Sequence, residues 1–229
     1  MPFPDLPARL REVHDRIEAA VGRGGHGQTV RIVAVTKTHA ADAVQAAADA
    51  GIGDVGENRV QEALPKMDAL DGRTAVRWHL IGHLQRNKVK SLARFQLLQS
   101  LDSSRLADSV NEFGTARHAA VNVLVQVNVV GEATKGGFER PEWSAEAARL
   151  RGLSGINIRG VMTMAPLGAD ERTLRAVFAG AREARDLLRA AGHQAEELSM
   201  GMSTDFEVAV EEGATYVRLG TILFGARSA

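Results

Sequence analysis

The strongest constraint in this 229-residue sequence is a regular alternation of strand-like and helix-like segments along its length. Short apolar runs rich in Val, Ile and Leu are separated by amphipathic stretches of helical period. Such alternation is typical of a parallel sheet, because parallel strands need a crossover connection that is usually a helix. The expected strands cover residues 30–36, a short run ending at 56–58, and 76–82, 95–101, 121–130, 156–164, 197–202 and 215–224.

The segments between these strands have the apolar spacing and end signals of helices. They cover 40–50, 60–70, 85–94, a helix capped by Ser103 or Ser104 and ended by Gly114, 143–150, a long helix ending near Gly192, and one from Phe206 closed by Gly213. An additional amphipathic helix over residues 4–21 precedes the first strand. Eight strands, each except the last followed by a helix, predict an α/β fold: one (β/α)₈ TIM barrel over residues 1–229 with an extra N-terminal helix. A doubly wound open sheet is the rival, although it usually takes fewer strands at this length.

Composition excludes several classes of protein. The 28 basic and 28 acidic residues cancel, so no overall field draws the chain to nucleic acid or to an anionic membrane. Without cysteine there is no disulfide framework and no thiolate metal site. His79 and His83, read on a strand, lie about 13 Å apart, too far to share an ion, so no metal is expected. Charges in the first residues and the lack of a long apolar run predict a cytoplasmic protein that neither enters nor spans a membrane.

The barrel fold predicts where chemistry occurs, because sites in such barrels lie at the carboxyl ends of the strands. Lys37 ends the first strand, and Arg218 and Gly220 belong to the last, which a closed barrel brings alongside the first. A lysine among apolar walls with a guanidinium nearby is pushed toward the neutral amine that attacks carbonyls. The alternative is a structural lysine that reaches from a strand end into solvent.

A second group suits an anion. Ser203 and Thr204 precede the helix that begins near Phe206, so their hydroxyls and its first amides can bind a phosphate, and Gly220 allows close backbone approach. Taken singly, Ser203 could equally be an ordinary N-cap and Gly220 a packing glycine. Together with Lys37, they indicate a site for an aldehyde that carries a phosphate.

Arg218 bears on the type of chemistry. Arginine only donates hydrogen bonds, so facing a pyridine nitrogen it would keep that nitrogen unprotonated and weaken the ring as an electron sink. Transamination, which depends on a protonated ring, is then disfavoured. A salt bridge from Arg218 to a carboxylate such as Glu57 is the alternative.

Several motifs resemble the pyridoxal phosphate homeostasis proteins over nearly the whole chain. They are Thr36-Lys37-Thr38-His39, Gly56-Glu57-Asn58, Trp78-His79-Leu80-Ile81-Gly82, Leu198-Ser199-Met200-Gly201-Met202-Ser203 and Val217-Arg218-Leu219-Gly220-Thr221. The resemblance implies a barrel of the alanine racemase N-terminal domain type, with pyridoxal 5′-phosphate (PLP) bound covalently to Lys37 as an internal aldimine. It also implies that Ser203, Gly220 and Thr221 hold the phosphate, that Arg218 faces the pyridine nitrogen, and that Asn58 lies close to the cofactor. Ala40 stands where this family often has proline, which affects only the loop after the lysine.

One absence bears on catalysis. Two-base racemisation needs an acid or base on each face of the cofactor, and racemases that resemble this barrel take a tyrosine from a further domain. Here Tyr216, the only tyrosine, lies inside the last strand. The prediction is therefore a monomeric PLP-binding protein with no catalytic residue, which supplies or buffers PLP for PLP-dependent apoenzymes in vitamin B6 homeostasis. A PLP-dependent racemase of low activity and a Schiff-base lyase acting on a phosphorylated sugar are the alternatives, and Lys135 is a candidate second amine.

Overall fold

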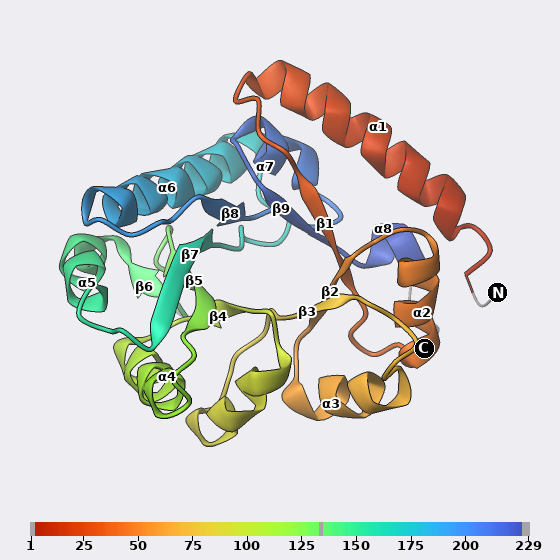
Figure 1. The fold of residues 1–229 in the computed structure, drawn as a ribbon. Helices are drawn as coiled ribbons and strands as arrows, with labels where there is room; N and C mark the ends of the chain where they lie inside the picture. Colours follow the sequence, from red (N-terminus) through yellow and green to blue (C-terminus); the bar gives the residue numbers. More distant parts are fainter. Residues whose placement is uncertain (1–2, 133–134, 226–229) are drawn as a thin grey trace.

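The computed structural model describes residues 3–132 and 135–225 and is a closed parallel β-barrel surrounded by helices (Figure 1). The strand order β4-β3-β2-β1-β9-β8-β7-β5 is closed by pairing of β4 with β5, so the predicted barrel is confirmed. The barrel strands are β1 (Arg31–Val35), β2 (Asp54–Glu57), β3 (Arg77–Leu80), β4 (Leu97–Leu101), β5 (Val121–Asn128), β7 (Ile156–Met162), β8 (Glu197–Ser199) and β9 (Tyr216–Leu219). A two-residue strand, β6 (Phe138–Glu139), which the sequence did not predict, pairs with the end of β5.

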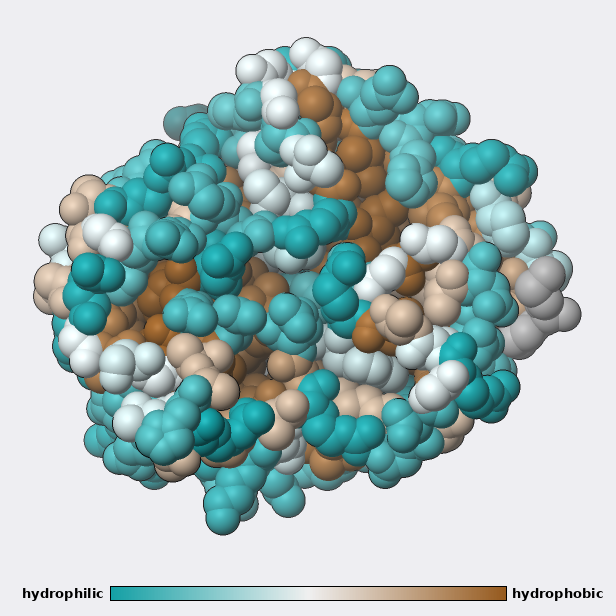
Figure 2. Space-filling view, viewed as in Figure 1, coloured by the Kyte–Doolittle hydropathy of each residue, from teal (hydrophilic) through white to brown (hydrophobic). Residues whose placement is uncertain are grey.

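Helices connect the strands on the outside of the ring. They are α1 (Leu6–Gly24), α2 (Ala41–Asp49), α3 (Val60–Ala69), the 3₁₀ helix η1 (Arg86–Arg94), α4 (Ser104–Ala116), the short 3₁₀ turn η2 (Arg140–Glu142), α5 (Trp143–Leu150), α6 (Glu171–Ala190), α7 (Phe206–Glu211) and α8 (Thr221–Phe224). All of them except η2 bury apolar residues in the core. Hydrophobic residues show in the hollows between the hydrophilic parts of the surface (Figure 2). A separate apolar cluster fills the lumen with Val33, Leu97, Leu124, Met162 and Tyr216.

The last strand is shorter than predicted, and this difference matters for the site. The apolar run 215–224 predicts one strand, but β9 ends at Leu219 and the chain turns at Gly220 into α8. The final strand is therefore followed by a helix after all. Hydrophobic residues continue through the turn because α8 buries Leu223 and Phe224 against the core.

Two glycine positions do not end helices as predicted. The leading helix was expected to stop before Gly22, yet α1 continues to Gly24. Position 24 requires glycine because a Cβ there would lie 2.4 Å from the carbonyl oxygen of Glu211 on α7. Gly114 lies inside α4 rather than at its end. Glycine is needed there because a Cβ would lie 1.9 Å from the carbonyl oxygen of Gly155. Both glycines allow close packing between elements distant in the sequence.

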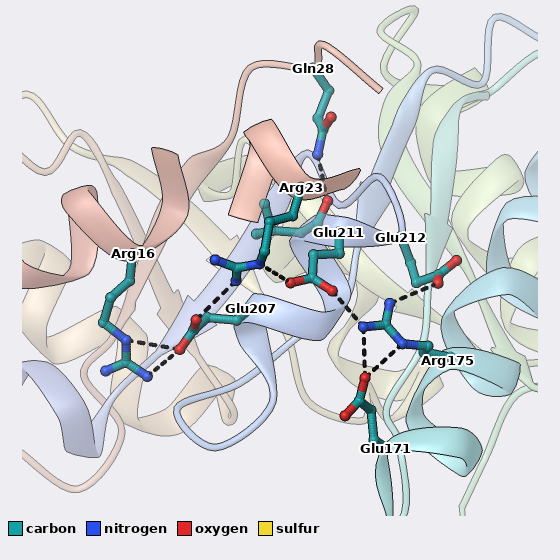
Figure 3. Close-up of polar contacts among 9 residues, drawn as sticks. Arg16, Arg23, Gln28, Glu171, Arg175, Glu207, Glu211 and Glu212 are labelled. Atoms are coloured by element: carbon teal, nitrogen blue, oxygen red, sulfur yellow. Dashed lines mark hydrogen bonds and ion pairs between the residues drawn. The ribbon is translucent and has the colours of Figure 1, made fainter. Parts of the chain in front are cut away.

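The extra helix α1 lies outside the ring against α7 and α8 (Figure 1). A ladder of ion pairs joins it to α7 and α6 (Figure 3). Arg16 donates to Glu207 at 2.7 Å, Arg23 donates to Glu211 at 2.5 Å, and Arg175 of α6 donates to the other oxygen of Glu211 at 2.6 Å. Glu211 is thus held between arginines of two helices and connects α1 to the barrel wall.

This arrangement gives stability a defined pH dependence. Burial raises the pKa of Glu211, but hydrogen bonds from Arg175 and Arg23 outweigh it and lower the pKa below its ordinary value of 4.5. The stabilisation is therefore fully present above that value and is lost as the pH falls through the lowered pKa of the folded protein. Glu211→Gln should reduce the free energy of unfolding at pH 7 by roughly 0.5–1 kcal/mol, the scale of partly exposed ion pairs. Urea unfolding at pH 7 and pH 3 measures this, and a difference between the two proteins that does not shrink at pH 3 would contradict it.

Candidate functional site

Lys37 lies at the carboxyl end of β1, beside the end of β9. These strands pair in parallel, with Val33 opposite Arg218 and Ala34 opposite Leu219, so the predicted neighbourhood of the first and last strands is confirmed. Val33 belongs to the apolar cluster in the lumen, and Lys37 lies in the turn that directly follows β1. Lys37 is half-buried, and a Cβ at Gly220 would lie 3.3 Å from the carbonyl oxygen of Val35. The turn that carries Lys37 and the turn after β9 therefore leave the barrel side by side.

A buried ion pair that sequence reasoning missed holds the residue before Lys37. The hydroxyl of Thr36 donates to Glu57 at 2.5 Å. The ammonium of Lys66, on α3, donates to Glu57 at 2.6 Å and to the carbonyl oxygen of Thr36 at 2.8 Å. Glu57 is fully buried and Lys66 is 9% exposed. The available signal was the position of Lys66 on the apolar face of α3, where a lysine needs a buried partner.

The residue after Lys37 adopts an unusual backbone conformation. Thr38 has φ of 67°, which a β-branched residue rarely adopts, and its amide donates to Glu62 at 3.3 Å. The ring of His39 then packs against Phe3 and Phe224, at centroid distances of 5.6 and 5.4 Å. The loop after the lysine is thus fixed by contacts to α3, to α8 and to the segment before α1. Ala40, where the family often has proline, is extended and precedes α2.

Arg218 is buried in the barrel rather than paired with Glu57. Its Nη1 donates to the hydroxyl of Ser199 at 2.7 Å, and its Nη2 donates to the carbonyl oxygen of Thr163 at 2.8 Å. Burial lowers the pKa of Arg218 to about 10, although the nearby carboxylate of Asp205 acts in the opposite direction. At neutral pH Arg218 remains a cation that can only donate hydrogen bonds.

Ser203 is not the cap of α7, since Asp205 occupies that position. Instead its hydroxyl accepts a hydrogen bond from the amide of Ile222 at 3.3 Å, which joins the turn after β8 to the first turn of α8. Gly201, with φ of 92°, permits this turn, because a side chain there would lie 2.7 Å from Cβ of Ala209. The structure therefore brings Ser203 together with Gly220 and the start of α8.

The remaining predicted residues have different surroundings. Thr221 is exposed as the first residue of α8, and Asn58 is half-buried at the end of β2, where Gly82 packs against its backbone. Thr204 is exposed and borders a separate hollow of about 280 Å³ beside Arg16 and Glu207. The side chain of Thr204 therefore lies apart from the contact between Ser203 and α8.

A polar cavity of about 190 Å³ lies at the opposite, amino end of the barrel. Its lining includes Arg31, Asp54, Arg77, His79 and Tyr216. The ring of Tyr216 is buried beneath the guanidinium of Arg31, whose carbon lies 4.1 Å from the ring centroid. Burial is the main cause that raises the pKa of the Tyr216 hydroxyl to about 12. Sequence reasoning placed attention on the carboxyl end alone and missed this cavity.

Within residues 3–132 and 135–225, no three His, Asp or Glu side chains are grouped so that they could hold a metal ion. Among those same residues, no helix has the length and apolar character needed to cross a membrane.

Comparisons with known proteins agree with this geometry. The model of the family described as alanine racemase, N-terminal domain, matches residues 9–228. The pyridoxal phosphate homeostasis protein of Aquifex aeolicus is 40% identical over 222 residues, covering 96% of this chain and 97% of the relative. The protein of the same name from Pseudomonas aeruginosa is 42% identical over 223 residues, covering 97% and 93% of the two chains.

Solved structures show the same fold. The structure of PipY of Synechococcus elongatus, with PLP bound, superposes with a TM-score of 0.85 at 35% identity and covers 96% of this chain and 100% of that one. The alanine racemase of Corynebacterium glutamicum superposes with a TM-score of 0.70 at 18% identity, covering 93% of this chain and 61% of that one. At that identity the racemase is similar in fold alone.

Proposed function

Since the chain belongs to the pyridoxal phosphate homeostasis protein family, we propose that it binds PLP on Lys37 and holds it in reserve for PLP-dependent apoenzymes. The observation that carries the proposal is the closure of the barrel, which sets Lys37 of the β1 end beside Gly220 and α8 of the β9 end. An amine beside a turn that offers a hydroxyl and backbone amides suits a phosphorylated aldehyde.

The residues present fit PLP. Lys37 supplies an amine, Arg218 a fixed donor, and Ser203 with the Gly220 turn a group of hydroxyl and amide donors. The missing side chain at half-buried Gly220 allows close approach to its backbone. When bound, the cofactor supplies an aldehyde that bonds to amines and a ring that withdraws electrons. In this proposal Asn58 and Thr221 border the cofactor, and Thr204 contributes if the exposed turn that carries it reorients.

Two features of the described residues support storage over efficient catalysis. Arg218 is a buried cation held by Ser199 and Thr163, so it can only donate toward the pyridine nitrogen, which weakens the ring as an electron sink. Tyr216 lies opposite Arg31 at the amino end of the barrel. Lys37 follows Arg31 by six residues, which corresponds to roughly 20 Å along the strand. Tyr216 is therefore too distant to act as a second base beside Lys37.

Reconstitution tests the proposal directly. The purified full chain mixed with PLP should develop a visible absorbance band, and borohydride should then fix a pyridoxyl group that peptide mass mapping locates on Lys37. Incubation with common amino acids in deuterated water should give negligible exchange at the α-carbon. A pyridoxyl group on another lysine would overturn the site, and rapid exchange that depends on Lys37 would favour the racemase alternative.

The role of Ser203 can be tested separately. Ser203→Ala removes a hydroxyl from the turn facing α8, so the dissociation constant for PLP should rise about tenfold, the scale of one hydrogen bond to a charged group. Affinity for pyridoxal, which lacks the phosphate, should stay unchanged. Fluorescence titration with both compounds measures the ratio, and Ser144→Ala, an exposed serine of α5, is the matched control. Equal loss for both compounds would contradict a phosphate contact.

The exposed hydroxyl of Thr204 needs its own variant. Thr204→Ala, tested in the same titrations, distinguishes a Thr204 side chain that contacts the phosphate from one that stays in the hollow beside Arg16. A loss confined to PLP would place Thr204 at the phosphate when the cofactor is bound. Unchanged affinity would leave Thr204 in the hollow beside Arg16, where the structure has it.

A further inference from the structure

Five buried polar side chains form a continuous hydrogen-bonded chain through the barrel lumen. Arg218 contacts Ser199 at 2.7 Å, Ser199 contacts Gln99 at 2.6 Å, Gln99 contacts His79 at 2.8 Å, and His79 contacts Asp54 at 2.9 Å. Each of the five residues is at most 4% exposed. The chain crosses from β9 and β8 to β4 on the far side of the ring, and ends at Asp54 in the amino-end cavity.

With the amide of Gln99 oriented as in the structure, the two ends of this hydrogen-bonded chain set the direction of each bond within it. Arg218 can only donate, so the hydroxyl of Ser199 accepts from it and is free to donate its own proton to Oε1 of Gln99. The amide nitrogen of Gln99 then faces Nδ1 of His79, which must accept. Nε2 of His79 therefore carries the proton and donates to the carboxylate of Asp54, which can only accept.

One other arrangement satisfies the same distances. If the amide of Gln99 were reversed, its oxygen would face Nδ1, and His79 would need protons on both nitrogens to satisfy Gln99 and Asp54 together. That arrangement adds a buried cation to a lumen that already contains Arg218. Asp54 does not need this cation, because Arg77 already binds both of its oxygens at 2.7 Å.

The carboxylate of Asp54 is a secure acceptor for this chain. Burial raises the pKa of Asp54, but hydrogen bonds from His79 and Arg77 outweigh it and hold the pKa well below its usual range. Asp54 is therefore ionised at neutral pH, and its charge is balanced by Arg77 from the side of the amino-end cavity.

We infer that Ser199, Gln99 and His79 are positioning residues, which hold Arg218 through a one-directional hydrogen-bonded chain anchored on Asp54. The role in cofactor binding rests on the proposed function, whereas the direction of the chain is a property of the protein itself. With Ser199 on Nη1 and the carbonyl of Thr163 on Nη2, the guanidinium is fixed in one orientation. Its direction toward the cofactor ring is thereby set from the opposite end of the barrel.

The tautomer of His79 tests the inference without the cofactor. Imidazole nitrogens that carry a proton differ strongly in ¹⁵N chemical shift from those that do not, and His79→Asn identifies the signal among the seven histidines. In the full chain at pH 7, with or without PLP, we expect a protonated Nε2 and an unprotonated Nδ1. Protons on both nitrogens, or on Nδ1 alone, would overturn the inference.

A variant of Gln99 tests its hydrogen-bond direction through the protonation of His79, which a purely structural role of Gln99 would not change. Gln99→Glu replaces the donor beside Nδ1 by a carboxylate oxygen, so His79 should gain a second proton. If the wild-type amide were reversed, this variant would leave an already doubly protonated ring unchanged, which would contradict the inference. Gln126→Met is the control. Gln126 is a buried glutamine of β5 that donates to the carbonyl of Gly136 and takes no part in the hydrogen-bonded series, so its replacement should leave the His79 signals unchanged.

Cofactor binding gives the second readout. Gln99→Met keeps the volume but breaks both bonds, so the dissociation constant for PLP should rise about fivefold and the absorbance band should shift, on the scale of one buried hydrogen bond. Unchanged affinity and band position would overturn the link from the chain to Arg218. Failure of the proposed function and failure of this inference give different results. A wild-type protein without a pyridoxyl group on Lys37 refutes the proposed function. A wild-type protein that has this group but shows another His79 tautomer refutes only this inference.

Discussion

Replacement of Lys37 by alanine is expected to abolish the visible absorbance band and the borohydride-stable adduct. Lys37 is the lysine that ends β1 beside Gly220, and a neutral side chain there cannot bond to an aldehyde. Residual PLP should bind only through the phosphate and Arg218, with affinity reduced at least about a hundredfold, as expected when a covalent bond is lost. Absorbance after gel filtration and intact mass after reduction measure both effects.

Two lysine variants serve as comparisons for Lys37→Ala. Lys90→Ala removes an exposed lysine of η1 and should leave the band and the adduct unchanged. Lys135, the candidate second amine, donates to the carbonyl of Ala165 at 3.0 Å and pairs with Glu132 at 2.7 Å, so it is already engaged. Lys135→Ala should therefore retain the Lys37 adduct. A band that survives in Lys37→Ala and disappears only when Lys135 is also replaced would refute Lys37 as the main site.

Removal of Lys66 should have the largest effect on stability. Lys66→Met leaves the fully buried carboxylate of Glu57 with only the hydroxyl of Thr36, and breaking a buried pair in this way costs about 3–5 kcal/mol. Urea unfolding at pH 7 measures the loss. The end of β1 should also loosen, because Lys66 holds the carbonyl of Thr36, so PLP binding should weaken as well.

The double variant separates charge from packing. Replacing both partners, in Lys66→Met with Glu57→Leu, removes the uncompensated charge and should recover most of the lost stability. Lys90→Met, at an exposed position, controls for the general effect of losing a lysine and should change the free energy of unfolding by less than about 0.5 kcal/mol. Equal instability of the single and double variants would mean that the pair acts through shape rather than charge.

The architecture was predictable because its signal is repeated. Eight apolar runs alternate with helical segments, and any one of them can be misjudged at its ends without changing the topology. The end of β9 is such a misjudgement: hydrophobic residues continue past Gly220, since α8 buries Leu223 and Phe224. The segment 86–94 has helical spacing but forms a 3₁₀ helix, a distinction that apolar periodicity does not encode.

The site was predictable where residue type and strand position coincide. Lys37, Arg218 and Gly220 lie at the ends of strands whose adjacency follows from closure alone. The partners of Glu57 and of Arg218 were not predictable, because Lys66, Ser199 and Thr163 reach them through contacts between strands and helices far apart in sequence. Such partners depend on side-chain direction across the barrel, which spacing along one segment does not specify.

The pairing of β1 with β9 has a consequence for how the protein is made. Synthesis delivers Lys37 early and Arg218 near the end, so a nascent chain on the ribosome holds the amine long before it holds the guanidinium. Until β9 has been synthesised and has paired with β1, Lys37 lacks its neighbours Gly220 and α8. Under the proposed function, PLP binding would therefore require the closed barrel, and a chain that lacks β9 would not retain the cofactor.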